Sequence, residues 1–496
     1  MCSSDLDVLK LDREAHGSHR VGERPGDGRF TAGARHERGI DGVDGDEVLE
    51  ELEGAVQSGC LSCQSSYAVH VDLVQPATRI ATAVRAAGGR ALCVGGFVRD
   101  RLRASTHAGT ASAPKDLDME VFGVPEDRLL TLLRSLGRVE PVGQAFPVYK
   151  LGEIDVALPR RESKTGRGHK GFSVTGDHTM SFEDAARRRD FTINAMGWDP
   201  LTDEYLDPFQ GRHDLDRGLL RVVDPATFAD DSLRVLRALQ FAARFDLALD
   251  VETARICAAI SLDDLPAERI WGEFEKLLLA AERPSIGFAL ARDLGVIRQV
   301  LPEMEPLYDC PQDPEWHPEG TVWIHTLMVI DQARRLNADL DRARLAAIML
   351  GAVCHDLGKP QTTAIIDGRI KSPNHEAMGV EPATRVLDRL NINTLDGFDV
   401  RRQVLGLVAE HLRPMAFFKA RDTITDGAFR RLAHKVDLEL LVRFARADCT
   451  GRAGTFDCSG IEWFIERATA LGVEHRLPAP ILLGRHLDRK STRLNS

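Results

Sequence analysis

The chain has 496 residues, enough for roughly two to four domains of ordinary size. Hydrophobic residues make up 43% and charged residues 28%, a globular balance, and no apolar run approaches the ~20 residues of a membrane span. The net charge of −11 argues against a uniformly basic surface, although an RNA partner needs only a local basic face. Nine cysteines occur without the spacing of a disulfide framework, which predicts reduced thiols and a cytoplasmic location.

The two ends of the chain lack the pattern of a folded domain. Residues 1–72 show no sustained hydrophobic period, and their isolated Cys60-x-x-Cys63 pair is a weak zinc half-site. The opening Met-Cys-Ser-Ser-Asp-Leu and the closing Arg-Lys-Ser-Thr-Arg-Leu-Asn-Ser resemble translated sequencing-adapter DNA. We therefore expect residues 1–72 to be a disordered or artefactual leader and residues 471–496 to be a truncated tail with an adapter-like end.

Between these ends, the pattern predicts a mixed α/β unit followed by helices. In chain order we expect a helix over 79–87, a strand over 91–94, a helix from 97, a strand over 116–122, a helix over 126–135, and a hairpin of strands 146–151 and 153–158. After about residue 230 the strand signals nearly vanish and helical periodicity takes over. A cluster of prolines between 302 and 318 indicates a second boundary.

Two carboxylates in the strand over 116–122 are the sharpest candidate site. Asp116 and Asp118 lie two positions apart and project to the same side, while Leu117, Met119 and Val121 face a core. Paired carboxylates repel each other unless a cation lies between them, and Mg²⁺ prefers a few carboxylates together with substrate phosphates. The pair therefore indicates a metal–nucleotide site, although a strand that faces solvent gives the same pattern.

Two further features point to the same chemistry. Gly95-Gly96 lies between a strand and a helix, where a bare backbone can approach phosphate, although a lone Gly-Gly is more often a tight turn. Asp155 lies in a later apolar strand and is a candidate third carboxylate, or simply an outward-facing residue. Three carboxylates around one or two metal ions would serve the attack of a hydroxyl on an α-phosphate.

These segments belong to a set of motifs that occur in order: Gly-Gly-Phe-Val-Arg-Asp over 95–100, Lys-Asp-Leu-Asp over 115–118, Arg-Arg-Asp-Phe-Thr-Ile-Asn-Ala-Met over 188–196, and Asp-Asp-Ser-Leu-Arg over 230–234. From about residue 75 to 485, the chain resembles the class II tRNA nucleotidyltransferases of the polymerase-β superfamily. The resemblance implies that Asp116 and Asp118 hold the catalytic Mg²⁺. It also implies a flexible loop over 163–170, and a nucleotide site formed by Gly95, Gly96, Arg99, Arg189, Asp190, Asn194, Asp231, Arg234 and Arg237.

The side chains of the last motif can select cytosine and adenine by hydrogen bonding. Cytosine and adenine share an amino donor beside a ring-nitrogen acceptor, so a carboxylate at Asp231 and a guanidinium at Arg234 can match both bases. Uracil and guanine would place mismatched groups there, which costs a few kcal/mol. The two residues lie on one helical stripe with Arg237, Phe241 and Arg244, and we expect Asp231 and Arg234 to be in contact at i, i+3 spacing. The bland alternative is a helix cap with a surface ion pair. The family usually has Glu-Asp where this chain has Asp230-Asp231, so the role of Asp230 stays open.

A second constellation lies in the helical rear of the chain. His355 and Asp356 come at the end of a strongly apolar helix that we expect to run to Gly358, and such groups are costly to bury unless they are paired or bound to metal. Together with His325 and Asp448, they resemble the HD phosphohydrolase superfamily, which implies a divalent transition metal. His375 and His411 match positions that some HD domains use for a second metal, or they are an ordinary loop histidine and a helix-end histidine.

Three alternatives stay open. A bacterial poly(A) polymerase shares the head motifs, but its basic doublet followed by phenylalanine is absent from residues 142–149. A partial enzyme would add only CC or only A. A protein of another class would be an RNA-binding scaffold with an inert head, which the intact carboxylates and HD residues disfavour.

The resemblance predicts a CCA-adding tRNA nucleotidyltransferase with an HD domain that acts as a phosphatase and a 2′,3′-cyclic phosphodiesterase. The expected fold is an α/β head over 73–212, an all-α neck over 213–300 and an all-α HD domain over 301–470. The expected partners are tRNA, CTP and ATP, with no membrane, and the formation of a homodimer stays open.

Overall fold

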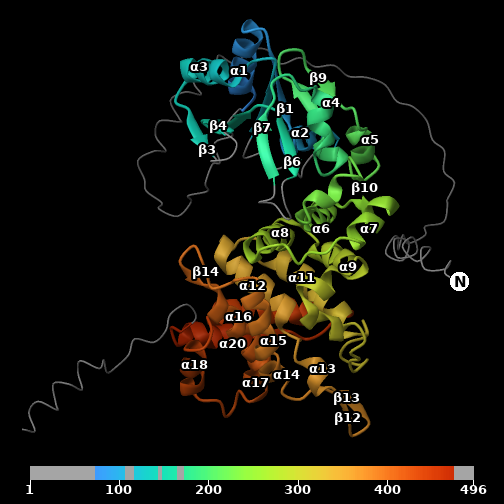
Figure 1. Ribbon diagram of the computed structural model, residues 1–496. Helices are drawn as coiled ribbons and strands as arrows, with labels where there is room; N and C mark the ends of the chain where they lie inside the picture. Colours follow the sequence, from blue (N-terminus) through green and yellow to red (C-terminus); the bar gives the residue numbers. More distant parts are fainter. Residues whose placement is uncertain (1–72, 107–116, 143–147, 165–171, 474–496) are drawn as a thin grey trace, which may run out of the picture. The chain divides into compact units, whose positions relative to one another are not determined.

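The structure of the chain is a computed structural model that describes residues 73–106, 117–142, 148–164 and 172–473 (Figure 1). All of these residues belong to one compact unit. Asp116, the Cys60/Cys63 pair, the tail from residue 474, and most of the stretch expected as a flexible loop lie outside the described residues.

The head contains a mixed seven-stranded sheet in the order β3-β4-β5-β2-β1-β8-β9. Only β2 and β5 run parallel to each other, and every other neighbouring pair is antiparallel. The strands of this sheet are β1 (Arg90–Val94), β2 (Leu117–Phe122), β3 (Glu140–Val142), β4 (Val148–Leu151), β5 (Ile154–Ala157), β8 (Gly197–Asp199) and β9 (Glu204–Leu206). The expected hairpin is confirmed, because β4 and β5 pair with Leu151 opposite Ile154.

The side chains of β2 alternate between two environments, as the sequence predicts. Leu117, Met119 and Val121 are buried, whereas Asp118 is exposed and Glu120 is half-buried. This alternation fixes the face of the strand that presents Asp118, because a shift of one residue would bury the carboxylates in the core.

The helices of the head follow the order expected from the sequence, and a separate antiparallel hairpin of β6 (Arg160–Lys164) and β7 (Phe172–Gly176) flanks the expected loop. The first two residues of that expected loop, Ser163 and Lys164, therefore belong to a strand. The helices are α1 (Val74–Ala86), α2 (Gly96–Thr106), α3 (Glu126–Leu136), α4 (Phe182–Arg187), the short 3₁₀ helix η2 (Thr192–Asn194) and α5 (Gly211–Asp216).

The rest of the described chain is almost entirely helical, which confirms the expected fold class. The first helices after the head are η3 (Phe228–Asp230), α6 (Leu233–Phe245), α7 (Val251–Ala258), α8 (Ala267–Ala280), α9 (Pro284–Asp293), α10 (Val296–Val300) and η4 (Pro302–Leu307). Strands β10 (Leu219–Leu220) and β11 (Ala248–Leu249) form a small parallel pair between them.

The HD region is a helical assembly with two small hairpins. Its helices are α11 (Val322–Leu336), α12 (Arg342–Cys354), α13 (Lys359–Thr362), α14 (His375–Met378), α15 (Val380–Arg389), α16 (Val400–Glu410), α17 (Arg413–Lys419), α18 (Asp426–Ala433), α19 (Leu438–Thr450) and α20 (Ser459–Ala470). The hairpins pair β12 (Ala364–Ile366) with β13 (Arg369–Lys371), and β14 (Thr394–Leu395) with β15 (Phe398–Asp399).

Two hydrophobic cores hold these elements together. One core lies in the head and runs from Leu73 to Trp198, and the other is continuous through the later helices from Phe191 to Val473. Helix α6 contributes Val235, Ala238 and Leu239, which follow the helical period, to the second core, and Leu236, Phe241 and Ala243 belong to the same core. None of the described helices is long and apolar enough to cross a membrane.

Candidate nucleotide pocket and candidate metal centre

Asp118 and Asp155 lie side by side on the head sheet. They are register partners on the parallel strands β2 and β5. Asp155 Oδ1 is buried and forms no hydrogen bond within the described residues, and Lys150 Nζ lies 3.7 Å from it. A buried carboxylate oxygen without a hydrogen bond, beside a second carboxylate, fits a divalent cation. Asp116, the other expected ligand, lies outside the described residues.

The turn before α2 brings the backbone close to this carboxylate pair. Gly95 has a φ of +70°, and a Cβ at this position would lie 3.0 Å from Arg189 Nη1 and 3.7 Å from Asp118 Oδ2. A side chain here would therefore be strained and would fill the space above Asp118. Gly96 is the first residue of α2, so the glycine pair leads into a helix N-terminus that favours anions.

A chain of hydrogen bonds links the motifs that the sequence separates. Arg99 Nη1 donates to Asn194 Oδ1 at 2.7 Å, and Asn194 Nδ2 donates to Asp190 Oδ1 at 3.0 Å. Arg237 Nε then donates to Asp190 Oδ2 at 2.6 Å. Burial alone would raise the pKa of Asp190, but the Arg237 charge and the Asn194 hydrogen bond hold it below its usual value. The chain joins α2, η2 and α6 into one polar wall.

Arg189 joins this wall to the metal side of the pocket. Its Nη2 donates to Glu120 Oε1 at 2.9 Å, and its Nη1 donates to the Asn194 carbonyl at 3.4 Å. The sequence analysis did not select Glu120. Its signal was its place two residues after Asp118 on the same strand face.

Asp231 and Arg234 do not form the expected i, i+3 pair, because α6 begins at Leu233 and Asp231 is extended. Asp231 Oδ2 instead accepts from Arg269 Nη2 at 2.9 Å, and Asp231 Oδ1 accepts from the Leu233 amide at 3.2 Å. Arg234 donates to two backbone carbonyls, those of Thr227 at 3.1 Å and Arg188 at 2.8 Å. Arg269 comes from α8, and no pattern in the sequence identified it.

One cavity of about 670 Å³ collects these groups. All of the described residues that the sequence analysis assigned to the head site and the nucleotide line it: Gly95, Gly96, Arg99, Asp118, Asp155, Arg189, Asp190, Asn194, Asp231, Arg234 and Arg237. The cavity thus offers the Asp118–Asp155 carboxylate pair and several guanidinium groups, two of which pair with Asp190 and Asp231. This arrangement can hold a cation together with a polyphosphate and can present polar groups to a base.

The second site is a buried cluster in the HD region. His325 comes from α11, His355 and Asp356 directly follow α12, and Asp448 comes from α19. The expected helix to Gly358 is wrong, because α12 ends at Cys354 and residues 355–358 form a turn. His375 begins α14 and His411 follows α16, and all six of these side chains are buried.

Three of the four imidazoles in the cluster have their Nδ1 fixed by a backbone carbonyl. His355, His375 and His411 lie with Nδ1 2.8–3.0 Å from the carbonyls of Ala352, Ser372 and Val408. A carbonyl can only accept, so these Nδ1 atoms carry protons and each Nε2 is left as an acceptor in the neutral ring.

In this orientation, several acceptor atoms at the centre of the cluster have no hydrogen-bond donor among the described residues, and a cation would stabilise them. His375 Nε2 lies 3.2 Å from His411 Nε2, so two acceptor lone pairs face each other when both rings are neutral. The buried His355 Nε2 and Asp356 Oδ1 form no hydrogen bond within the described residues. Three ligand atoms from His325, His355 and Asp448 lie within 4.8 Å of one another, and so do three from Asp356, His375 and His411. A third such group, His317, Glu319 and His325, lies beside them. Imidazole and carboxylate donors in this arrangement fit one or two divalent transition metals.

The carboxylates of the cluster remain ionised despite their burial. Burial would raise the pKa of Asp356, but His355 and Lys359 hold it well below its usual range. Burial acts on Asp448 in the same direction, and there Arg452 and His325 lower the pKa. Lys359 Nζ lies 2.7 Å from Asp356 Oδ2 and donates to Gln312 Oε1 at 2.7 Å.

A further carboxylate, Glu319, supports the cluster from outside. Its Oε1 lies 3.0 Å from His325 Nδ1 and 2.9 Å from His317 Nδ1, and its Oε2 accepts from the Ala453 amide at 3.2 Å. A carboxylate behind a metal-binding histidine orients the ring and increases its basicity. The sequence analysis missed Glu319, although its place six residues before His325 was a signal.

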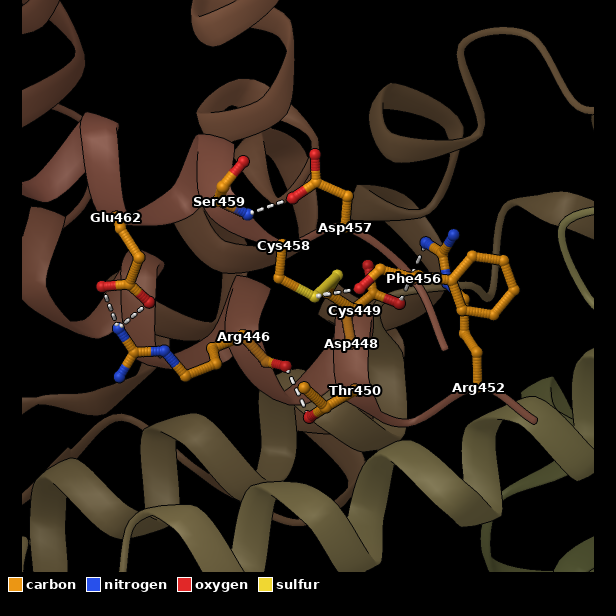
Figure 2. The surroundings of a disulfide bond; sticks show 10 residues. All are labelled: Arg446, Asp448, Cys449, Thr450, Arg452, Phe456, Asp457, Cys458, Ser459 and Glu462. Carbon is orange, nitrogen blue, oxygen red and sulfur yellow. Dashed lines mark hydrogen bonds and ion pairs between the residues drawn. A yellow bond between two sulfur atoms is a disulfide. The ribbon is translucent and has the colours of Figure 1, made fainter. Parts of the chain in front are cut away.

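One expectation about the cysteines is wrong. Cys449 and Cys458 form a disulfide, and α19 and α20 bring their Cα atoms to 6.2 Å (Figure 2). Spacing alone did not reveal this pair, because it depends on how the chain turns between two helices. The free cysteines among the described residues, Cys93, Cys257, Cys310 and Cys354, are all buried.

Three family models match consecutive parts of the chain. The poly A polymerase head domain matches residues 91–221, the probable RNA and SrmB-binding site of polymerase A matches residues 244–308, and the HD domain matches residues 322–449.

The curated relatives of the chain are multifunctional CCA proteins. The protein of Methylococcus capsulatus is 37% identical over 379 residues, covering 74% of this chain and 83% of the relative. The protein of Xanthomonas campestris is 36% identical over 403 residues, covering 77% and 91%. The protein of Acinetobacter baumannii is 33% identical over 380 residues, covering 73% and 85%.

Solved structures of CCA-adding enzymes share the fold. The Bacillus stearothermophilus enzyme in complex with CTP is 19% identical with a TM-score of 0.54, and the match covers 84% of this chain and 87% of that one. The Thermotoga maritima enzyme complexed with tRNA is 18% identical with a TM-score of 0.53, covering 85% and 87%.

Proposed function

This chain belongs to the family of multifunctional CCA proteins, and we propose that it adds C, C and A in turn to the 3′ end of tRNA from CTP and ATP. The observation that carries the proposal is the hydrogen-bond chain from Arg99 through Asn194 and Asp190 to Arg237, which lines one cavity with Asp118, Asp231 and Arg234. The family combines a nucleotidyltransferase head with an HD phosphohydrolase domain, and the chain is an enzyme of this class.

We assign Mg²⁺ to the head, with Asp118, Asp116 and Asp155 as its carboxylate ligands. The metal supplies Lewis-acid stabilisation when the tRNA 3′-hydroxyl attacks the α-phosphate and pyrophosphate leaves. Arg99 and Arg189 are placed to neutralise the triphosphate. The Gly95–Gly96 turn provides the room for a phosphate near Asp118.

We assign base selection to Asp231 and Arg234. Each carboxylate oxygen of Asp231 keeps acceptor capacity beyond its hydrogen bond to the Leu233 amide or to Arg269, so it can accept from the amino group of cytosine or adenine. Arg234 lines the same cavity and can donate to the ring nitrogen. No template is needed, because the protein itself presents the matching edge.

We assign phosphatase and 2′,3′-cyclic phosphodiesterase activity to the HD cluster, with one or two divalent transition metals. His325, His355 and Asp448 would hold one ion, and Asp356, His375 and His411 a second. Such an activity would trim damaged or cyclised RNA ends before addition. A cytoplasmic location and a homodimer remain predictions from the sequence.

Replacing one carboxylate tests the head assignment. Asp118→Asn should lower CTP incorporation into a tRNA that lacks its CCA end by on the order of 10³-fold, because metal binding is lost while tRNA binding remains. Glu140→Gln changes an exposed carboxylate on β3 and is the matched control. Unchanged incorporation by Asp118→Asn would contradict the proposal and favour an inert scaffold.

Metal analysis tests the HD assignment. His355→Ala should lower the bound transition metal and abolish hydrolysis of an RNA that ends in a 2′,3′-cyclic phosphate. Retention of both the metal and the hydrolysis would contradict the assignment.

A further inference from the structure

The HD cluster opens into a cavity of about 950 Å³ with two unlike walls. The inner wall carries ligand-cluster residues, namely Asp356, His375, His411 and Asp448. The outer part carries aromatic rings and cations, namely Trp316, Phe418, Phe456, Lys371, Lys419 and Arg452. A phosphate held at the inner wall would therefore have the rest of its molecule against aromatic and basic side chains.

Trp316 is unusual because it is a large aromatic side chain that is half in water. It is 51% exposed and is the only aromatic residue among the exposed large apolar side chains of the described chain. Its ring stacks beside Phe456, with centroids 6.5 Å apart and an interplanar angle of 29°. An exposed aromatic face at the rim of a cavity can stack against a flat ring of a ligand.

Both rings are fixed to the ligand cluster. Trp316 lies in a turn in which the amides of Trp316 and His317 donate to the Asp313 carbonyl, and His317 contacts Glu319 behind His325. The turn therefore connects the exposed ring to the metal centre.

Phe456 is held from the other side. It lies between Cys449 and Cys458, and the disulfide between them closes this segment directly after Asp448 (Figure 2). Arg452 lies 3.7 Å from Asp448 Oδ1, and its guanidinium lies 5.6 Å from the centre of the Phe456 ring. The ring is thus placed at a defined distance from a ligand of the cluster.

The charges of the rim favour an anionic ligand with a flat ring. Two carboxylates, Asp313 and Asp457, also line the cavity, but Asp313 is paired with Arg369 and Asp457 Oδ1 accepts from the Ser459 amide. Lys419 and Lys371 belong to the same rim, and Lys371 also pairs with Asp367 at 3.1 Å. Aromatic faces next to cations bind nucleobases by stacking, and this mode tolerates any base because each has a π-face.

We propose that Trp316 and Phe456 form a nucleobase-binding wall of the HD cavity, with Phe456 held by the Cys449–Cys458 disulfide. The ligand is a nucleotide or an RNA 3′ end, whose base stacks on this wall while its phosphate reaches the histidine–aspartate cluster. The inference deepens the proposed phosphohydrolase function and rests on it.

The test compares a ligand that has a base with one that lacks it. Adenosine 2′-phosphorothioate and glycerol 2-phosphorothioate, in which sulfur slows hydrolysis, are titrated into the manganese-loaded full chain by calorimetry. The wild type should bind the adenosine compound roughly tenfold or more tightly. Trp316→Ala and Phe456→Ala should each weaken that binding by roughly fivefold to 100-fold and leave the glycerol compound unchanged, whereas Trp316→Phe should restore most of it.

Two further variants sharpen the test. Ile365→Ala removes an exposed apolar side chain that does not line the cavity and should bind both compounds as the wild type does. Cys458→Ser should weaken only the adenosine compound, because Phe456 loses its brace. The proposal is overturned if the wild type shows no preference for the adenosine compound, or if Trp316→Ala and Phe456→Ala bind it as tightly as the wild type does. Hydrolysis of the corresponding phosphates, measured separately, tests the proposed hydrolase function alone.

Discussion

Arg237 on helix α6 donates through Nε to Asp190 Oδ2 at 2.6 Å, and this bond joins the neck helix to the head motif. Asp190 is 7% exposed, so removal of its charge would leave Arg237 without its main partner. Asp190→Ala should lower the free energy of unfolding at pH 7 by about 3 kcal/mol and also lower CTP incorporation. Urea unfolding and a kinetic assay measure the two effects.

The control variant is Asp339→Ala, which breaks an exposed pair with Arg443 and should lower the free energy of unfolding by less than about 1 kcal/mol. Equal losses for the two variants would contradict the structural role of Asp190.

Arg269 holds the residue that we assign to base selection. Its bond to Asp231 Oδ2 fixes the carboxylate in the cavity. Arg269→Ala should lower kcat/KM for CTP by about tenfold and increase UTP misincorporation, because a mobile carboxylate discriminates less well. Single-nucleotide extension with each triphosphate measures both changes. Arg255→Ala, which breaks only an exposed pair with Glu252, is the control. Unchanged selectivity in Arg269→Ala would show that Asp231 does not need this partner.

Much of the head could be predicted from the sequence because local rules determine it. The alternation along β2 follows from the strand period, and the Gly95 turn follows from the position between a strand and a helix. Asp231 could not be placed, because its pairing depends on Arg269, which lies 38 residues later in the chain. Local spacing predicted a helical pair, but tertiary packing gave Asp231 a different partner.

The same division holds in the HD region. The histidine–aspartate doublet was visible in the sequence because it follows an apolar helix. Contacts between distant segments could not be predicted in the same way. They bring His375 Nε2 close to His411 Nε2 and stack Trp316 on Phe456. The disulfide was missed for the same reason, since a separation of nine residues fixes neither distance nor direction.

Glu319 should influence metal binding without being a ligand of the central cluster. Glu319→Gln keeps the shape of the side chain but weakens its hold on His325 Nδ1. We expect the affinity for the HD metal to fall by about 10- to 100-fold. Equilibrium dialysis followed by elemental analysis measures this affinity. Glu315→Gln, which changes an exposed partner of Arg369, is the control. If Glu319→Gln binds metal as tightly as the control does, Glu319 has no positioning role.

His411 should make the metal-free protein sensitive to acid. Burial, with the charges of His375 and His355, lowers the pKa of His411 from 6.5 to about 3, while Asp448 and Asp356 oppose the shift. The folded state keeps the ring neutral, and the unfolded chain takes up a proton below pH 6.5. The contribution is therefore complete above pH 6.5 and is lost as the pH falls toward 3, by about 1.4 kcal/mol per pH unit.

The measurement is the difference in unfolding free energy between the wild type and His411→Asn. This difference should be constant above pH 6.5 and should change in favour of the variant by about 1.4 kcal/mol per unit between pH 6 and 4. A difference that does not vary with pH would contradict the neutral state of His411.

The central claim is that this chain builds a CCA end without a template. The most direct test incubates the purified full chain with a tRNA that lacks its CCA end, and offers each nucleoside triphosphate separately and then all four together. The account predicts two additions with CTP alone, no addition with UTP or GTP, and C, C and then A with the full set. Long A-tracts, or no incorporation of C, would contradict it.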